Sequence, residues 1–235
     1  MKSSADVLET RGFIDEKSVS AEDYSDNVSL IEQLKSDESA ARTRAAIIIR
    51  RRAAAELIPE LIAALKSESK LYSKIEISNA LISFGESSVG PLIGCLGEIG
   101  NNQHRALPGK PFGKDSYPLP RDIAARILVN IGEPVIDPLM AAELTSGQMR
   151  EAVDVLGHIS FYSDDKRALP FLINCYADNS GDKVLRWKLI RALSAFENEE
   201  SLLLLNTIVS DSRIDAFVWE AERSLRLISS RAEKG

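Results

Sequence analysis

One apolar pattern recurs along the chain at intervals of about 32 residues. Each copy places a leucine three positions after another aliphatic residue, and the leucines are 31, 47, 33 and 33 residues apart. The copies are "LIPELIAALK" (57–66), "SVGPLIGCLG" (88–97), "VIDPLMAAEL" (135–144), "ALPFLINCYA" (168–177) and "SLLLLNTIVS" (201–210), with a more divergent copy, "NVSLIEQLK" (27–35), one period earlier. A period of this length predicts repeated supersecondary units that stack on one another.

A second apolar stretch follows each of these segments. In five of the six, a leucine is followed three positions later by another apolar residue, which marks one face of a helix. Gly85 and Gly132 suit helix C-caps, Pro59 and Pro134 suit first helical turns, and no strand alternation is sustained. We therefore predict an all-α fold, a right-handed α-solenoid of about six antiparallel helix pairs. The expected repeats are 27–55, 56–86, 87–133, 134–163, 164–198 and 199–230.

These segments resemble a known class of helical repeats. "ELIPELIAALK" and "EPVIDPLMAA" are similar to the first helix of HEAT-like repeats, and "IAARILVNIG" is similar to their second helix. The resemblance extends to the short HEAT repeats named after phycobilisome lyases, and it covers residues 27–230. It implies a solenoid but no single function, because such repeats occur in scaffolds, lyase subunits, hydroxylases and DNA-binding enzymes.

Composition narrows the class of protein. The 235-residue chain has a net charge of −6 and no stretch of 18 apolar residues, so we expect neither a membrane span nor charge-driven nucleic-acid binding. With only two cysteines and no signal-peptide pattern, a cytoplasmic location is the expectation. Residues 1–26 contain seven acidic residues against three basic ones, and this segment is expected to be either disordered or a single helix.

The sequence offers little for catalysis. Its two histidines, His104 and His158, lie outside any metal-binding spacing, so we predict no metal site, no cofactor and no catalytic residue. Cys95 and Cys175 share one repeat column with small or apolar residues, which predicts buried free thiols. The segment "GKPFGKDS" in 109–116 fails as a phosphate-binding loop in its spacing, in its residues and in lacking a preceding strand.

Basic residues recur near the start of the second helices. Lys74, Arg121 and Arg186 each lie seven positions before a repeat leucine, Arg42 is equivalent, and Arg150 lies nearby. This basic ladder could hold an acidic partner or a phosphate backbone. Alternatively, each base pairs with an acid of its own or a neighbouring repeat, such as Asp37, Glu68 or Asp182, and we favour this second interpretation.

Trp187 and Trp219 share the next column, 32 residues apart. Exposed tryptophans would be binding hot spots, whereas buried ones would pack between the last repeats. We favour packing, although Trp187 stays a candidate contact.

An insertion of about sixteen residues lies within the third repeat, at 100–120. A loop of this length without periodicity is usually functional or disordered. The insertion carries Arg105, Lys110 and Lys114, with Phe112 and Tyr117 as aromatic contact area. It is either a partner contact or a tolerated insertion.

Taken together, these patterns predict a non-enzymatic scaffold that binds a protein partner on its concave face. The candidate contacts are Lys74, Arg121, Arg150, Arg186 and Trp187 on the second helices, with the aromatic and basic residues of the insertion beside them. The alternative is an enzyme or enzyme subunit, lyase-like or DNA-repair-like, that binds nucleic acid. Oligomeric state is not predicted.

Overall fold

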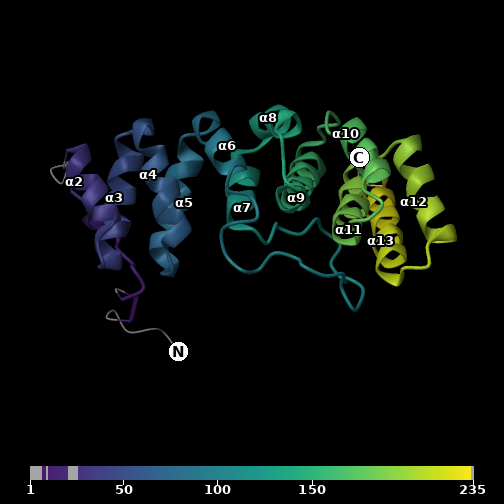
Figure 1. Ribbon diagram of the computed structural model, residues 1–235, viewed down its shortest axis with the longest axis horizontal. Coiled ribbons are helices and arrows are strands. Elements are labelled where there is room, and N and C mark those ends of the chain that lie inside the picture. The colour runs from purple at the N-terminus through teal and green to yellow at the C-terminus, as the bar shows by residue number, and fades with distance from the viewer. Residues whose placement is uncertain (1–6, 9, 21–25, 234–235) are drawn as a thin grey trace. The chain divides into compact units, whose positions relative to one another are not determined.

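The structure, a computed structural model, describes residues 7–8, 10–20 and 26–233. Within these ranges the fold is all-helical and contains no strand, as expected (Figure 1). Helices occupy every segment in which the repeat pattern predicts one. They are α2 (Asn27–Leu34), α3 (Ser39–Arg51), α4 (Ile58–Ser67), α5 (Leu71–Ser83), α6 (Glu86–Ile93), α7 (Ile123–Ile131), α8 (Ile136–Ala141), α9 (Ser146–Ser163), α10 (Leu169–Asp178), α11 (Lys183–Ala192), α12 (Glu199–Asp211) and α13 (Asp215–Ala232).

Local sequence signals set several helix boundaries. Gly132 is the C-cap of α7 at φ 89°, a conformation that glycine adopts without strain, and Pro59 lies in the first turn of α4. Thr145 and Gln148 form a capping box at the start of α9. Short 3-10 turns precede α4 and α8 and follow α11; they are η3 (Ala55–Leu57), η4 (Glu133–Val135) and η5 (Leu193–Ala195).

The chain divides into two compact units, unit 1 (residues 1–94) and unit 2 (residues 95–235). The repeat domain predicted over 27–230 includes parts of both units and stays a prediction. The division falls inside the third predicted repeat, after α6, where the 100–120 insertion separates a first helix from its second. An inserted loop interrupts the regular succession of helices at that point.

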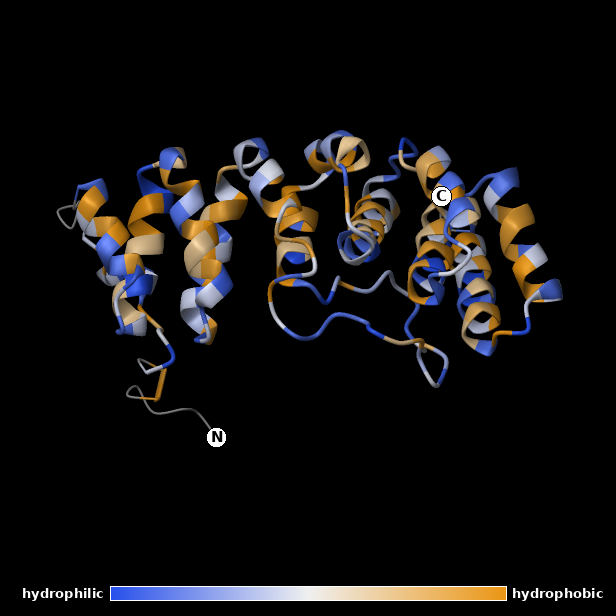
Figure 2. Cartoon of the chain, in the orientation of Figure 1, coloured by the Kyte–Doolittle hydropathy of each residue, from blue (hydrophilic) through white to orange (hydrophobic). Residues whose placement is uncertain are grey.

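Unit 1 is built around α3 and α5, which pack side by side, with α2 and α4 against them. Its core includes Ile47, Leu61, Ile77 and Leu81, each 1% exposed or less. Figure 2 shows that its helices are amphipathic. This agrees with the three- and four-residue spacing of apolar positions in the sequence.

The segment before α2 packs on unit 1. The Thr43 hydroxyl lies 2.7 Å from the carbonyl oxygen of Gly12, and Arg51 donates to the carbonyls of Glu16 and Val19. Residues 10–20 contain one 3-10 turn, η1 (Glu16–Ser18). In this part the chain is therefore an ordered segment held by side chains of α3, neither disordered nor a single helix. The rest of the expectation for 1–26 concerns 1–6, 9 and 21–25, which lie outside the described residues.

In unit 2 the second helices follow one another in space: α7 packs on α9, α9 on α11 and α11 on α13. Leu128, Leu156, Leu189 and Phe196 are among its buried residues. Cys95 and Cys175 are both buried and form no disulfide, which agrees with the prediction of buried thiols.

Candidate binding site beneath the 100–120 loop

The loop between α6 and α7 returns to the helices of unit 2 and is fixed there by Tyr117. This side chain is 2% exposed, and its ring lies 5.9 Å from that of His158 and 5.6 Å from that of Phe161, both on α9. Gly157 makes room for it, since a Cβ at that position would overlap the Tyr117 hydroxyl. Burial raises the pKa of the Tyr117 hydroxyl well above its usual value, so the group stays protonated.

The loop also contacts α11 and α13 (Figure 1). On α11, the Trp187 ring meets the His104 ring edge-on at 4.8 Å. On α13, Arg223 donates to the carbonyl oxygens of Lys114 at 3.1 Å and Ser116 at 2.6 Å, and its guanidinium lies over the Phe112 ring. The loop thus contacts three successive second helices.

A chain of buried charges lies beneath the loop. On the α9 side, Lys188 Nζ lies 2.8 Å from Glu151 Oε1 and 3.0 Å from Asp154 Oδ2. On the α13 side, Arg223 pairs with Glu220 at 2.6 Å. Arg191 lies between the two, 3.6 Å from an oxygen of Asp154 and 3.6 Å from one of Glu220. Three acids and three bases therefore alternate across α9, α11 and α13, and their formal charges balance.

This ionic network was missed by the sequence reasoning, although a signal for it exists. Each second helix has a leucine that marks its apolar face, and two charged residues lie five and two positions before it. These pairs are Glu151 and Asp154 before Leu156, Lys188 and Arg191 before Leu193, and Glu220 and Arg223 before Leu225. Charged residues on the core-facing side of three successive second helices need partners on the neighbouring second helices, because an unpaired buried charge is costly.

A cavity of about 200 Å³ lies between the loop and the network. Its loop side includes His104, Phe112 and three prolines, and its helix side is formed by Asp154, Trp187 and Arg191. Three polar atoms of these helix residues have no hydrogen-bond partner among the described residues: Asp154 Oδ1, Trp187 Nε1 and Arg191 Nε. All three atoms are buried, and the residues that carry them line the cavity.

The cavity is cationic at its rim. Lys110 and Arg121 line it and are exposed, whereas the network behind it is balanced in charge. His104 adds no charge at neutral pH, because burial, followed by the proximity of Arg191 and Arg121, lowers its pKa to about 4. The arrangement suits an anionic group.

The stability of unit 2 should depend on pH through His104. The depressed pKa means that the unfolded chain takes up a proton near pH 6.5 while the folded chain does so only near pH 4. Stability is thus fully present above pH 6.5 and falls as the pH drops towards 4. Because the imidazole is only half-buried, we expect a loss of about 1 kcal/mol between pH 7 and pH 5. Denaturant unfolding of wild type and His104→Gln at both pH values measures it, and an equal loss in the variant would contradict it.

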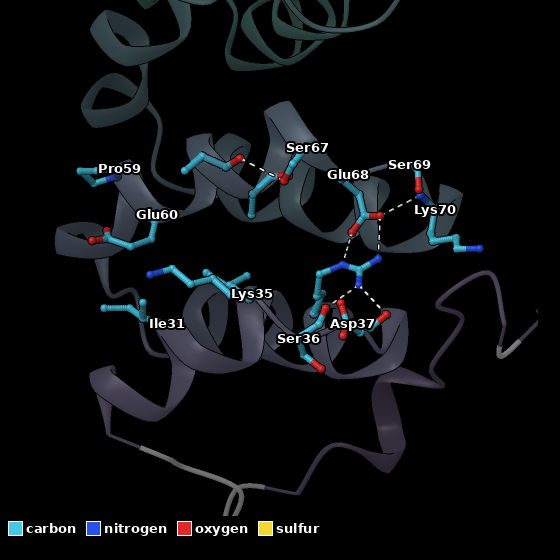
Figure 3. A pocket seen from close by; sticks show the side chains of 14 residues that line it. Ile31, Lys35, Ser36, Asp37, Pro59, Glu60, Ser67, Glu68, Ser69 and Lys70 are labelled. Carbon is cyan, nitrogen blue, oxygen red and sulfur yellow. Dashed lines mark hydrogen bonds and ion pairs between the residues drawn. The ribbon is translucent and has the colours of Figure 1, made fainter.

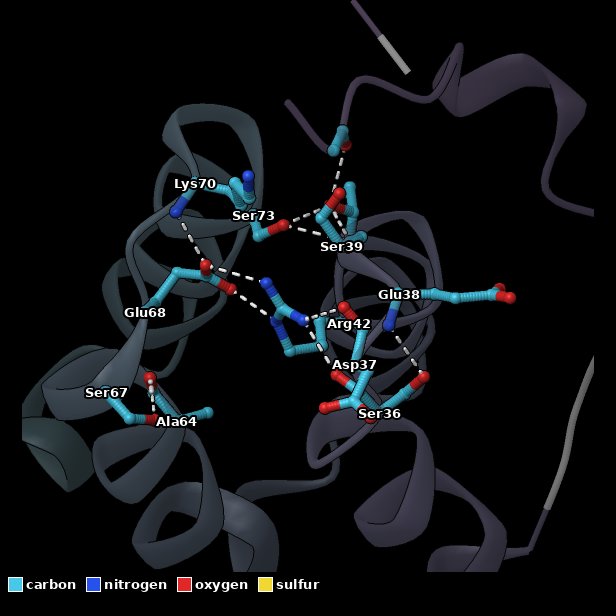
Figure 4. Close-up of polar contacts among 12 residues, drawn as sticks. Ser36, Asp37, Glu38, Ser39, Arg42, Ala64, Ser67, Glu68, Lys70 and Ser73 are labelled. Carbon is cyan, nitrogen blue, oxygen red and sulfur yellow. Dashed lines mark hydrogen bonds and ion pairs between the residues drawn. The ribbon is translucent and has the colours of Figure 1, made fainter. Parts of the chain in front are cut away.

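In unit 1 one residue of the basic ladder, Arg42, is held in an ion pair. Arg42 makes a two-point contact with Glu68, at 2.7 and 2.9 Å, and donates to the carbonyls of Ser36 and Asp37 (Figure 4). Glu68 also accepts a hydrogen bond from the Lys70 amide. The pair lies at one side of a groove of about 750 Å³ between α2 and α4. The lining of this groove contains both acidic and basic side chains (Figure 3). The favoured pairing interpretation is confirmed for Arg42.

The ladder residues of unit 2 differ from one another, and among the described residues only one of them pairs with an acid. Arg150 pairs with Asp182 at 2.8 Å, which confirms the predicted pairing there, and Asp182 also caps α11. Arg186 stacks over the Tyr176 ring at 4.2 Å. Within the described residues, only Lys74 and Arg121 of the ladder make no ion pair and no ring contact.

The structure brings together only part of the predicted contact set. Lys110, Phe112, Arg121 and Trp187 meet at the cavity. Arg105 and Arg150 line a smaller cavity of about 130 Å³ together with Glu151, and Lys114 is exposed on the loop. Trp187 and Tyr117 are each 2% exposed, so both serve packing, as favoured for Trp187. Lys74 belongs to unit 1.

Among the described residues there is no cluster of three or more side chains able to hold a metal ion. None of the helices in the described ranges combines the length and apolar character that a bilayer crossing requires. Neither the protein-family models nor the curated proteins contain a match to this chain.

Proposed function

We propose that this chain is a non-catalytic interaction protein, a HEAT-like right-handed solenoid of six helix pairs that binds an acidic protein partner. The repeat of about 32 residues and the succession of second helices in unit 2 support the architecture. The partner contact is the 100–120 loop with the cavity beneath it.

A single observation carries this proposal: the 100–120 loop has three exposed basic residues against one acidic residue, Asp115. Arg105, Lys110 and Lys114 are exposed, and none forms an ion pair with any part of the chain that the structure describes. Arg150 and Arg191, in contrast, are matched by acids. On a chain of net charge −6, such a local patch favours encounter with an acidic surface.

The loop is also held in one conformation before any partner arrives. The burial of Tyr117 and the two hydrogen bonds from Arg223 fix its backbone. A pre-ordered loop loses less conformational entropy on binding than a free one. An insertion without a function needs no such contacts, so this anchoring supports a functional role for the loop.

The thiols give no support to catalysis. Burial raises the pKa of Cys175, which disfavours the nucleophilic thiolate at pH 7, and Cys95 is buried as well. His104 is held neutral without a nucleophile among its described contacts. These features favour binding over the enzyme alternative.

Reversing the loop charges is expected to weaken partner binding at least tenfold, a loss of about 1.4 kcal/mol, with a smaller salt dependence of what remains. The variant is Arg105→Glu, Lys110→Glu and Lys114→Glu together. Its control is Lys183→Glu, Arg213→Glu and Arg226→Glu, three exposed bases of the same unit with the same change in net charge. Proteins captured from cell extract by wild type are purified and their Kd values measured by calorimetry for all three forms.

A partner that binds the loop variant and the control equally well would refute the loop contact. Tight binding of duplex DNA by the wild type at physiological salt would refute the protein-binding assignment itself. Circular dichroism of both triple variants verifies that each is folded.

A further inference from the structure

We propose that the cavity beneath the loop receives one carboxylate side chain of the acidic partner. This inference rests on the proposed function and names the group that is recognised. Its ligand is a glutamate or aspartate side chain, hydrogen-bonded by Arg191 and Trp187 and drawn in by Lys110 and Arg121.

The first argument is the state of Arg191. Its side chain is 5% exposed, yet both of its ion-pair distances are 3.6 Å, beyond hydrogen-bonding range, and Nε has no acceptor among the described residues. Its guanidinium is positioned over the Trp187 ring at 4.0 Å. A buried guanidinium has five N–H donors and normally satisfies them. With its two carboxylate neighbours both at 3.6 Å, Arg191 gains a closer acceptor when a carboxylate enters the cavity.

A second donor lies on the same wall. Trp187 is 2% exposed, and its Nε1 has no acceptor among the described residues. Buried indole N–H groups usually have a hydrogen-bond partner. A carboxylate has two oxygens and can accept from Arg191 and Trp187 together.

The negative charge of Asp154 is offset within the network by Lys188 and Arg191. One of its oxygens lies 3.0 Å from Lys188 Nζ, and the network that contains it is balanced in charge. The two further charges that line the cavity, Lys110 and Arg121, are both positive. A single entering carboxylate is therefore attracted by a formal excess of two positive charges.

The size of the cavity fits one side chain. Its volume of about 200 Å³ is below the range of about 300–1,000 Å³ typical of drug-sized ligand sites. Pro108, Pro111 and Pro118 form apolar walls for the methylene groups of a glutamate. Leu119, 59% exposed, lies at the mouth. Ordered water is the competing occupant, since one water takes up about 30 Å³.

The test uses the full chain and a tryptophan reporter. In a Trp219→Phe background, Trp187 is the single tryptophan and lines the cavity. The probes are acetylated, amidated triglutamate, the matching triglutamine and inorganic phosphate. We expect a saturable change of Trp187 fluorescence with triglutamate and none with triglutamine, and calorimetry checks the stoichiometry.

Two exposed rim positions supply variants that leave the buried network intact. Arg121→Gln is expected to weaken triglutamate binding about tenfold, and Leu119→Phe, which narrows the mouth, to weaken it by a similar factor. Arg213→Gln, an exposed position outside the cavity, is the matched control and should bind as wild type does. Arg191→Gln should abolish the response, provided that circular dichroism shows a folded chain.

Several results would overturn the inference. They are an absent or non-saturable response to triglutamate, an equal response to triglutamine, an equal or tighter response to phosphate, and binding that Arg121→Gln and Leu119→Phe leave unchanged. If the loop triple variant loses its partner but both rim variants retain it, the cavity inference fails and the proposed function stands. If triglutamate fills the cavity but no partner depends on the loop, the proposed function fails.

Discussion

Replacing Lys188 by methionine is expected to lower the free energy of unfolding of unit 2 by about 3–5 kcal/mol. Lys188 is 0% exposed, and its ammonium is the shared counter-ion of Glu151 and Asp154, whose side chains are at most 4% exposed. Burial already raises the pKa of Glu151, and Lys188 opposes that rise. Without the lysine, two buried carboxylates face each other, and the cost of an unpaired buried charge exceeds the gain from the added apolar surface.

Tryptophan fluorescence in a denaturant titration measures this loss, because Trp187 and Trp219 both belong to unit 2 and are the chain's two tryptophans. The double variant Lys188→Met, Glu151→Met is expected to recover part of the loss, since Asp154 keeps Arg191 as its partner. The deficit of the single variant should shrink at acidic pH, because protonation removes the charge from Glu151, whose pKa is raised by burial. Unfolding curves that coincide for wild type and Lys188→Met would show that the network contributes nothing to stability.

Replacing Tyr117 by alanine is expected to cost about 3–5 kcal/mol in unit 2, the range for deleting a buried aromatic side chain. The ring fills the space above Gly157 and contacts His158 and Phe161, and the carbonyl of Tyr117 accepts a hydrogen bond from Tyr162. Loss of the ring should also free the loop, so trypsin should cleave after Arg105 and Lys114 faster than in wild type.

Tyr117→Phe is the matched control. The Tyr117 hydroxyl is buried and has no hydrogen-bond partner among the described residues, so its removal should change stability by less than about 1 kcal/mol. A Tyr117→Ala variant with wild-type stability and wild-type protease resistance would mean that the loop does not depend on this contact.

The helical architecture could be read from the sequence because each helix obeys a local rule. Apolar spacing of three and four residues, Gly132 after α7 and Pro59 at the start of α4 all act within one or two turns. The buried thiols followed from the same repeat columns. The division after α6 did not follow, because it depends on how the insertion displaces the contacts that a regular repeat would make.

The candidate site was predicted only in part for a related reason. The sequence indicates Lys110, Phe112, Arg121 and Trp187 as candidate contacts, with packing favoured for Trp187, but it does not bring Asp154 and Arg191 together. The path of a loop without periodicity is set by its tertiary partners alone. The charged columns of α9, α11 and α13 could have revealed the buried network, but not that the loop would cover it.

The anchoring of the loop by Arg223 has a consequence for the order in which unit 2 is made. Arg223 lies 109 residues after Lys114, so the loop leaves the ribosome long before its partner on α13 exists. Until α13 arrives, Arg191 also lacks Glu220. Contacts so distant in sequence form late and slow the completion of a fold. Unlike a regular helical array, which can grow pair by pair, unit 2 becomes complete only when its last helix closes both the ionic network and the loop.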